Sequence, residues 1–206
     1  MKLGPSAFFF AAAIIFEGQA ETLSFDFKDP RGVSNIAFSL NAPLESIRGT
    51  AKGISGSVNV DPENLAAATG KISVATKSLV VPNPLMRMHL LSKDWLNARS
   101  NPEITFEIKD TSRVRKTGVN ASQVEVNGAF TLNGIAKPII ADAEIIYLPG
   151  KLKESSAGAL QGDLLVVRSN FSIKRSDFGI RPGEFLDKVA DEIALSVNII
   201  GAARRK

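Results

Sequence analysis

A short helical pattern runs directly into a strand pattern at residues 88–106, which read MHLLSKDWLNARSNPEITF. The helical part has apolar residues at the spacing of one helix face, namely Leu85, Met88, Leu91 and Trp95. Pro102 ends the turn, and the residues of 103–109 then alternate between apolar and polar, as they do in a half-buried strand. We therefore predict one amphipathic helix, from about residue 83 to residue 99, that lies between two strands and covers part of a sheet.

Alternating apolar and polar residues continue through most of the chain, which predicts strands rather than further helices. Turn-forming residues separate these runs, as at residues 61–64 and at Pro149-Gly150. Asn133-Gly134 falls between two apolar runs and predicts a two-residue type I′ hairpin, because both central positions of that turn need a positive φ. One apolar and one polar face per strand favour an antiparallel sheet. The runs lie around residues 23–27, 36–40, 54–60, 72–74, 104–108, 124–132, 145–147, 167–173 and 193–199.

The apolar faces of these strands need a cover that one short helix cannot provide. Either two sheets stack as a sandwich, or one sheet closes with its apolar face inward. A barrel of about eight strands leaves room for side chains or for one small ligand, and the inward positions here are mostly Val, Ile and Leu. We therefore predict an all-β fold, an antiparallel barrel of about eight strands with one short amphipathic helix inserted between strands. A packed sandwich, such as an adhesion module with a solid core, is the alternative.

Residues 1–20 predict a secretory signal peptide. Lys2 precedes an apolar run at residues 7–16, and Gly18-Gln19-Ala20 forms a small-residue ending that places cleavage before Glu21. The apolar run is shorter than the roughly 20 residues that a membrane-spanning helix needs. We expect residues 21–206 to form a single domain in the periplasm or outside the cell. The chain contains no cysteine, so we predict that the protein is not a lipoprotein.

The composition argues against several classes of function. Without cysteine the fold cannot rest on disulfide bonds, so the core must stabilise it alone. The net charge is +4, but the basic residues are scattered and do not form the basic stripe with exposed aromatic residues that nucleic-acid binding needs. Three basic residues are grouped at 204–206. They favour a solvated tail, with transient contact to an anionic membrane surface as the alternative.

Residues with catalytic or metal-binding chemistry are few. His89 is the single histidine, so a zinc site would need carboxylates for every other ligand, and we predict no metal. No Gly-x-Ser-x-Gly nucleophile motif is present. We interpret His89 as a helix-face side chain that is hydrogen-bonded to a nearby turn, and Arg175 with Asp177 as a structural pair or turn cap. An exported isomerase or hydrolase that acts on an apolar substrate through His89, Asp94 or Asp177 is the alternative function.

Four segments, in chain order, resemble motifs of the YceI-like family. The segment 175–180 keeps the family's Arg-x-Asp-Phe-Gly-Ile intact, and 128–137 follows Gly-x-Leu-Thr-Leu-x-Gly-Val-x-Lys with Phe130 and Ile135 substituted. The other two are residues 86–90 with Trp95 and 101–106, and the ending 191–195. The likeness extends over essentially the whole chain after residue 20. It implies a bacterial exported protein with a lipocalin-like barrel that holds a polyisoprenoid chain.

The chain departs from the family pattern at three places. Val33 stands where family members often have the histidine of His-Ser-x-Val-x-Phe. Met86-Arg87 replaces Arg-Asp before the helix histidine, and Asn101 replaces the tyrosine of Tyr-Pro. If those groups meet a ligand head group, this protein prefers a different or less polar head. The strand pattern survives these changes, so the barrel prediction stands.

We therefore predict a carrier for a long-chain apolar lipid, of polyisoprenoid or isoprenoid-quinone type, with no catalytic residue and no catalytic cofactor. The predicted helix caps one side or end of the barrel, either as part of the lipid site or only as a structural lid. The sequence leaves the oligomeric state open, a homodimer included. The residues that we predict to line the lumen are Ile36, Phe38, Leu40, Ile72, Val74, Ile104, Phe106, Phe130, Leu132, Phe171, Ile173, Leu195 and Val197 from the strands, and Met88, Leu91 and Trp95 from the helix.

Overall fold

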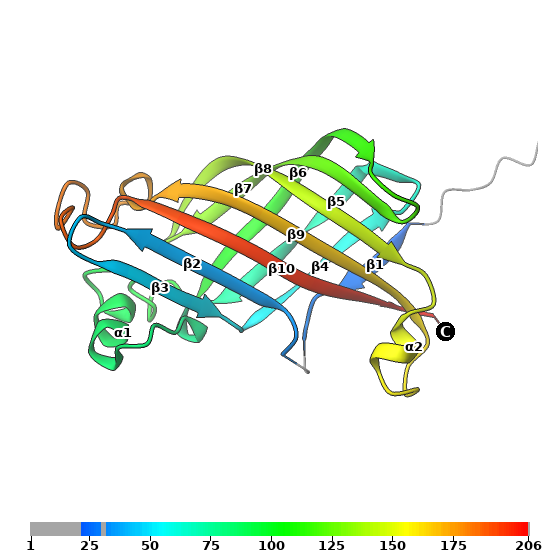
Figure 1. Ribbon diagram of the computed structural model, residues 1–206, viewed down its shortest axis with the longest axis horizontal. Helices are drawn as coiled ribbons and strands as arrows, with labels where there is room; N and C mark the ends of the chain where they lie inside the picture. Colours follow the sequence, from blue (N-terminus) through cyan, green and yellow to red (C-terminus); the bar gives the residue numbers. More distant parts are fainter. Residues whose placement is uncertain (1–21, 30–31, 206) are drawn as a thin grey trace, which may run out of the picture.

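The computed structural model describes residues 22–29 and 32–205, in which ten strands form one antiparallel sheet (Figure 1). The predicted signal peptide and its cleavage site lie outside these residues. The strands are β1 (Leu23–Asp26), β2 (Asn35–Asn41), β3 (Ser46–Ala51), β4 (Ile54–Asp61), β5 (Asn64–Ala75), β6 (Glu103–Lys116), β7 (Ala121–Leu132), β8 (Ile135–Leu148), β9 (Gly162–Lys174) and β10 (Glu192–Arg204). Between them lie short helical segments, the 3₁₀ turns η1 (Thr76–Ser78) and η2 (Arg175–Phe178) and the helices α1 (Pro84–Leu91) and α2 (Leu152–Ser155).

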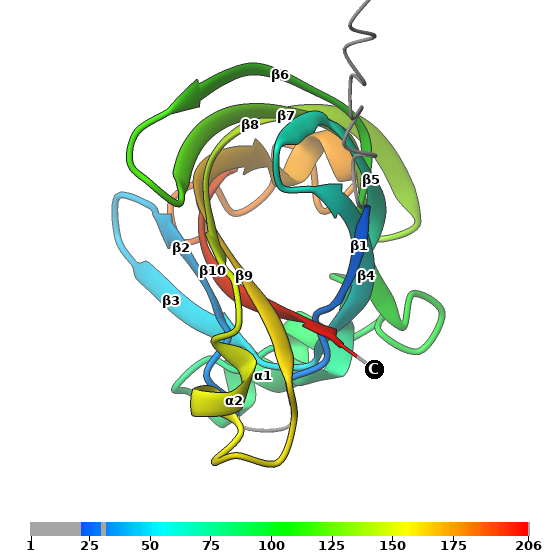
Figure 2. The ribbon, with the colours of Figure 1, turned by 90° about the vertical axis from the view of Figure 1, so that its right-hand side faces the viewer.

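Eight of the strands close into a barrel, which Figure 2 shows from one end. Their order around the barrel is β1, β4, β5, β6, β7, β8, β9 and β10, and β10 meets β1 at the pair Ala202 and Asp26. The remaining hairpin, β2–β3, extends the sheet from β10. The predicted all-β antiparallel barrel is confirmed, and the two stacked sheets of a sandwich are not formed.

The edge of β10 that closes the barrel is shared between two short strands. β2 pairs with residues 194–198 of β10, whereas β1 reaches β10 at Ala202. Between these pairings the backbone amide of Ile200 donates a hydrogen bond of 3.1 Å to Oγ of the buried Ser34. An unpaired buried amide costs free energy. Ser34 therefore supplies the hydrogen-bond acceptor at the place where β2 ends and β1 begins along the edge of β10.

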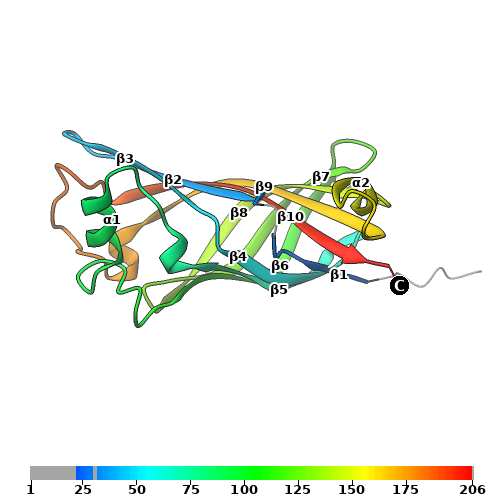
Figure 3. The same ribbon diagram turned by 90° about the horizontal axis from the view of Figure 1, so that it is seen from below.

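One end of the barrel, here called the α1 end, is covered by the long connection between β5 and β6. Within this connection Val80 exchanges two backbone hydrogen bonds with Thr50 of β3, of 2.9 and 2.8 Å. Asn83 then caps α1, since its Oδ1 accepts hydrogen bonds from the amides of Leu85 and Met86. Figure 3 shows α1 at this end of the molecule together with the connection between β9 and β10.

The helix is shorter than the sequence pattern predicts. α1 ends at Leu91, and residues 92–101 form turns rather than a helix that continues to residue 99. Short polar side chains such as Ser92 and Asn97 compete with the backbone for helical hydrogen bonds, and Asn97 takes a left-handed φ of 45°. Trp95 consequently lies in the turns after the helix and not on the helix itself.

The turn between β7 and β8 has the predicted form. Asn133 and Gly134 have φ values of 50° and 76°, and the flanking residues pair directly across the turn. The side chain of Asn133 also accepts a hydrogen bond from Nδ2 of Asn101, at 3.0 Å, and donates one to the carbonyl of Phe178, at 3.2 Å. The turn therefore ties the β5–β6 and β9–β10 connections together at the α1 end.

The opposite end of the barrel is held by the buried carboxylate of Asp163. Its oxygens accept hydrogen bonds from the hydroxyl of Tyr147 (2.9 Å), the amide of Gly150 (2.7 Å) and the guanidinium of Arg205 (3.0 Å). Arg204 is the last residue of β10 and pairs with β9. Both arginines are exposed to solvent as predicted, but they are attached to the barrel and do not form a free tail. The last residue of the chain lies outside the described part.

The pKa of Asp163 is lowered, which makes this end of the barrel sensitive to acid. Burial acts to raise the pKa, but the hydrogen bonds from Gly150 and Tyr147 and the charge of Arg205 outweigh burial. A carboxyl group whose pKa is lowered in the folded state stabilises the fold above its unfolded pKa of about 4. That contribution is lost as the pH falls through the folded-state value.

We predict that Asp163→Asn lowers the free energy of unfolding at neutral pH by ~1–3 kcal/mol, because a charged acceptor of three hydrogen bonds is replaced by a neutral amide. The difference from the unchanged protein should shrink below about pH 4. Urea unfolding at neutral pH and in acid measures both effects. The exposed Asp142→Asn in β8 is the matched control and should alter neither. An equal loss of stability at both pH values would contradict the role of the ionised carboxylate.

Candidate functional site

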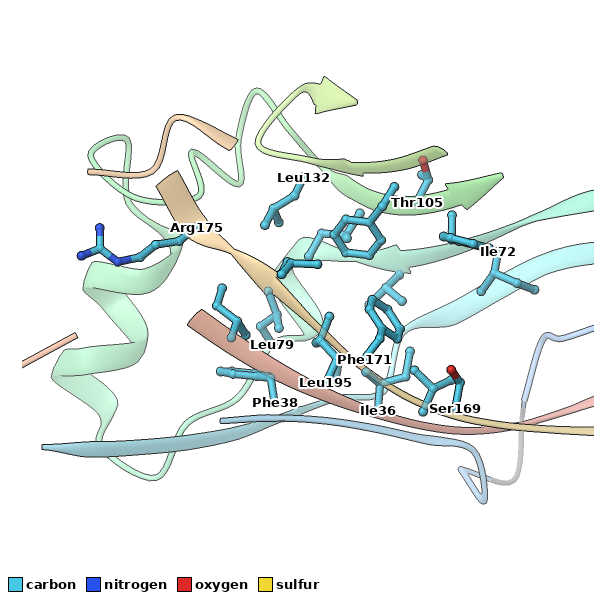
Figure 4. Close-up of a pocket in the computed structure, with 18 of the residues that line it drawn as sticks. Ile36, Phe38, Ile72, Leu79, Thr105, Leu132, Ser169, Phe171, Arg175 and Leu195 are labelled. Carbon is cyan, nitrogen blue, oxygen red and sulfur yellow. The ribbon is translucent and has the colours of Figure 1, made fainter. Parts of the chain in front are cut away.

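The barrel encloses a cavity of about 820 Å³, at the upper end of the range usual for small-molecule sites. Its wall is mostly apolar and is formed by inward side chains of the strands from β2 to β10, together with α1 and the β9–β10 connection. Figure 4 shows Ile36, Phe171 and Leu195 projecting toward the same space from three different strands. The middle of the barrel is therefore open rather than filled by side chains.

The structure places every predicted strand residue in the wall of this cavity. They are Ile36, Phe38, Leu40, Ile72, Val74, Ile104, Phe106, Phe130, Leu132, Phe171, Ile173, Leu195 and Val197. Trp95 also lines the cavity, from the turns after α1. Further lining residues belong to the same alternating runs and share their inward direction, among them Val58, Val60, Val124 and Ile145. Contact of these side chains with a lipid stays a prediction.

Two residues predicted to face the interior do not line the cavity. The side chain of Met88 is 60% exposed, and Leu91 packs against the core outside the cavity wall. Met86, His89 and Leu90 line the cavity instead. Because α1 carries apolar residues on almost every side, their spacing does not decide which side faces inward.

Arg87 fixes the rotation of α1 about its own axis. Its Nε donates a hydrogen bond to the carbonyl of Leu79, at 3.0 Å, and its Nη2 donates one to the carbonyl of Lys77, at 2.8 Å. These bonds attach one side of the helix to the segment around η1. Met86 and Leu90, which are four residues apart and therefore on one side of the helix, then face the cavity.

Two glycines in the barrel wall make room for phenylalanine rings. The ring of Phe38 lies in the space that a side chain would need at Gly49, its cross-strand partner. The ring of Phe106 does the same at Gly128 of the neighbouring strand. The two rings consequently lie along the wall, and the lumen between them and the opposite strands stays open.

The cavity reaches the surface at the α1 end, and this opening is here called the mouth. Leu85 and Phe185 are 59% and 48% exposed, yet both also line the cavity. The connections that meet at this end also supply the charged and titratable lining residues, namely Glu45, His89, Asp94, Arg175, Arg181 and Lys188. The ligand space is therefore polar at the mouth and apolar further in.

The β9–β10 connection beside the mouth is organised by the buried guanidinium of Arg175. Burial lowers the pKa of Arg175, while the charges of Asp191 and Glu184 act to raise it, and an arginine stays protonated in proteins. The predicted structural role is confirmed, but the predicted pairing with Asp177 is wrong, because the guanidinium bonds to backbone carbonyls. Its N–H groups donate, over distances from 2.5 to 3.2 Å, to the carbonyls of Ile180, Arg181, Glu184, Val189 and Ala190.

Aromatic and cationic side chains stack on one another at the mouth. Cζ of Arg175 lies 5.8 Å from the centre of the Trp95 ring. That ring lies 6.2 Å from the ring of Phe185, centre to centre, and Cζ of Arg181 lies 5.3 Å from the Phe185 ring. Cation–π contacts of this kind are favourable where water is partly excluded. The stack holds Trp95 in the cavity wall, at the side of the mouth.

The three candidate catalytic residues lie in different places. His89 and Asp94 line the mouth, whereas Asp177 is exposed in η2 and does not line the cavity. Within residues 22–29 and 32–205 the side chain of His89 forms no hydrogen bond, so its predicted bond to a turn is wrong. The same residues contain no group of three or more His, Cys, Asp or Glu that could hold a metal ion. No helix in the described part of the chain is long and apolar enough to cross a membrane.

Of the three departures from the family pattern, only Met86 lies at the cavity. The side chain of Asn101 donates to the carbonyl of Leu96 and to Asn133, which directs it into the connections around the α1 end. Val33 is exposed and does not line the cavity. Of these three positions, only Met86 is therefore placed where it could contact a ligand head group.

The fold and the cavity define a small antiparallel barrel with an apolar lumen that opens at one end. The sequence matches the family model described as YceI-like domain over residues 29–200. Because this match covers most of the chain, the protein belongs to the YceI-like family, as the four motifs predict.

Two curated relatives show the extent of the likeness. The UPF0312 protein of Pseudomonas aeruginosa (strain LESB58) is 28% identical over 146 residues, which cover 71% of this chain and 69% of the relative. Protein YceI of Escherichia coli O157:H7 is 27% identical over 157 residues, which cover 76% of this chain and 74% of the relative. The likeness therefore extends over most of both proteins in each case.

Solved structures share the fold. BcnA of Burkholderia cenocepacia has a TM-score of 0.61 and 23% identity, with 81% of this chain and 94% of that protein covered. The YCEI protein of Campylobacter jejuni has a TM-score of 0.58 and 25% identity, with 77% and 84% covered. A polyisoprenoid binding domain from Saccharophagus degradans has a TM-score of 0.64 at 10% identity, with 89% and 99% covered.

Trp95 is the single tryptophan of the chain, so its fluorescence reports on the mouth. We predict that titration with a long-chain prenol shifts the Trp95 emission to shorter wavelengths and that the shift saturates, because bound lipid removes water from the ring. Trp95→Phe should abolish the signal while lipid binding, followed by radiolabelled lipid, continues. An emission spectrum that stays the same when radiolabelled lipid is bound would show that residues 92–101 are only a structural lid.

Proposed function

We propose that this protein is an exported carrier that holds a long-chain apolar lipid, of polyisoprenoid or isoprenoid-quinone type, in the lumen of its barrel. The observation that carries the proposal is the apolar cavity of about 820 Å³ that reaches the surface at the α1 end. Membership of the YceI-like family supports it. The structural neighbour from Saccharophagus degradans, which is described as polyisoprenoid binding, is a further support.

The energetics of such a site favour long chains. Burial of hydrocarbon is worth about 0.8 kcal/mol per carbon, so an isoprene unit of five carbons adds roughly 4 kcal/mol. Association costs ~4–15 kcal/mol, and micromolar affinity needs about 8 kcal/mol net. A few buried units are therefore sufficient. Because area and shape supply most of the affinity, the site should accept several lipids of similar width.

The alternative function, an exported isomerase or hydrolase, has less support from the geometry. His89 and Asp94 border the mouth, where the other charged lining residues also lie. Asp177 lies outside the cavity. The wall further in, where the body of an apolar substrate would lie, is formed by hydrocarbon side chains and a few hydroxyl groups. The arrangement is thus better suited to holding a lipid than to transferring protons to or from it.

Export is part of the proposal and rests on the sequence of residues 1–20. Fractionation of cells that produce the protein tests it. The mature protein should be recovered from the periplasm or the medium, with an N-terminus at Glu21. Recovery of the unprocessed chain from the cytoplasm would contradict it.

We predict that protein purified without detergent contains an isoprenoid lipid, which mass spectrometry of a solvent extract identifies. Two neighbouring positions of β10 offer a matched pair, because Val197 lines the cavity and Ser196 is exposed on the other face. Val197→Trp should fill the lumen and remove most of the lipid, whereas Ser196→Trp should leave the lipid content unchanged. Unchanged protein that is consistently empty, and that ignores added prenyl lipids, would count decisively against a carrier.

Contact with a membrane is proposed at the mouth, where exposed apolar side chains surround the opening. Met88 and Leu186 are 60% and 48% exposed and do not line the cavity. We predict that Met88→Ser with Leu186→Ser slows the transfer of lipid from vesicles several-fold and leaves the equilibrium affinity unchanged. Val119→Ser, at a fully exposed apolar residue in the hairpin at the other end, is the control. Equal transfer rates for all three proteins would show that the mouth does not dock on the membrane.

A further inference from the structure

Thr111 lines the inner part of the cavity. Thr111 of β6 pairs with Val126 of β7, and both residues line the cavity. Two register shifts in β6, one on each side of Thr111, interrupt the alternation of inward and outward side chains along this strand. The neighbouring cross-strand pairs do not line the cavity. Their side chains hydrogen-bond to each other at 3.3 Å, Asn127 to Asp110 and Ser112 to Glu125.

This hydroxyl has no hydrogen-bond partner among residues 22–29 and 32–205, although Thr111 is only 5% exposed. A buried polar group without a partner destabilises the fold. Ser169, another hydroxyl of the cavity wall, is satisfied, because its Oγ donates to the carbonyl of Asp142 at 2.6 Å. The Thr111 hydroxyl is therefore unpaired within the fold, and a rotation about the Cα–Cβ bond, which exchanges the hydroxyl with the methyl group, would present it to a group inside the cavity.

The surroundings of Thr111 determine which chemical group suits it. β6 begins at the α1 end with Glu103, and Thr111 lies roughly 25 Å further along the strand, away from the mouth. Its neighbours across β7 and β8 are Val126 and Ala141. The cationic lining residues lie at the mouth, so a phosphate placed beside Thr111 would be buried without a counter-charge. A neutral hydroxyl or carbonyl group needs only one hydrogen bond there.

We propose that Thr111 is the polar contact of an inner subsite that binds a neutral, oxygen-bearing group of the lipid, such as the hydroxyl of a prenol or the carbonyl of a quinone. The hydrocarbon chain then extends from this group toward the mouth. The inference rests on the proposed carrier function and adds to it the polarity and the direction of the ligand.

Two substitutions separate the hydroxyl from the shape of the side chain. Thr111→Val keeps the shape and removes the hydroxyl, and Thr111→Ser keeps the hydroxyl. The probes are a long-chain prenol and the hydrocarbon of matching length. Thr111→Val should weaken prenol binding about three- to tenfold, the loss of one neutral hydrogen bond, and leave hydrocarbon binding unchanged. Thr111→Ser should keep the preference for the prenol. The melting temperature of lipid-free Thr111→Val should equal or exceed that of the unchanged protein, because an unpaired hydroxyl is removed.

The outcomes distinguish this inference from the proposed function. If the unchanged protein binds neither probe, the carrier function is wrong and the inner subsite with it. If it binds both but Thr111→Val keeps its full preference for the prenol, the carrier function stands and the inner subsite is wrong. A lipid-free Thr111→Val protein that melts well below the unchanged protein would show that the hydroxyl already has a partner in the fold, which also overturns the inference.

Discussion

The closure of the barrel depends on how β10 divides its free edge between β1 and β2. Where β1 occupies the edge, the ring of strands is complete, and Phe25 and Phe27 are fully buried within it. Where β2 occupies it, the β2–β3 hairpin continues the sheet outward, and the β5–β6 connection has to cover the remaining space. One sheet is therefore closed by a strand along β1 and by a covering connection along β2, with Ser34 at the changeover.

The mouth is built from connections with little regular secondary structure, so its backbone groups need partners other than a strand ladder. Arg175 supplies such partners for carbonyls spread along the β9–β10 connection. Asn101 and Asn133 join the β5–β6 connection to the β7–β8 turn, and Asn133 continues the link to Phe178. A few polar side chains thus order three separate connections and leave the opening between them free.

The strands, the Asn133-Gly134 turn and the inward strand residues could be predicted from sequence, because period-two alternation is a local property of the chain. The inward side of α1 could not, since it depends on the bonds that Arg87 makes to distant carbonyls. Thr111 escaped prediction because the register shifts around it break the alternation within a polar stretch. Phe185 and Arg181 at the mouth belong to a connection without periodicity, and their contribution to the cavity becomes visible only in three dimensions.

The packing of each phenylalanine ring against a glycine of the barrel wall suggests how relatives of this protein can change the width of the lumen. A methyl group at Gly49 or Gly128 would displace the ring of Phe38 or Phe106 from the wall. The displaced ring would then occupy the lumen, so the bore of the barrel would narrow although no lumen residue had changed. Evolution and protein engineering therefore share a simple means of adjusting the width of the accepted chain, at positions that never touch it.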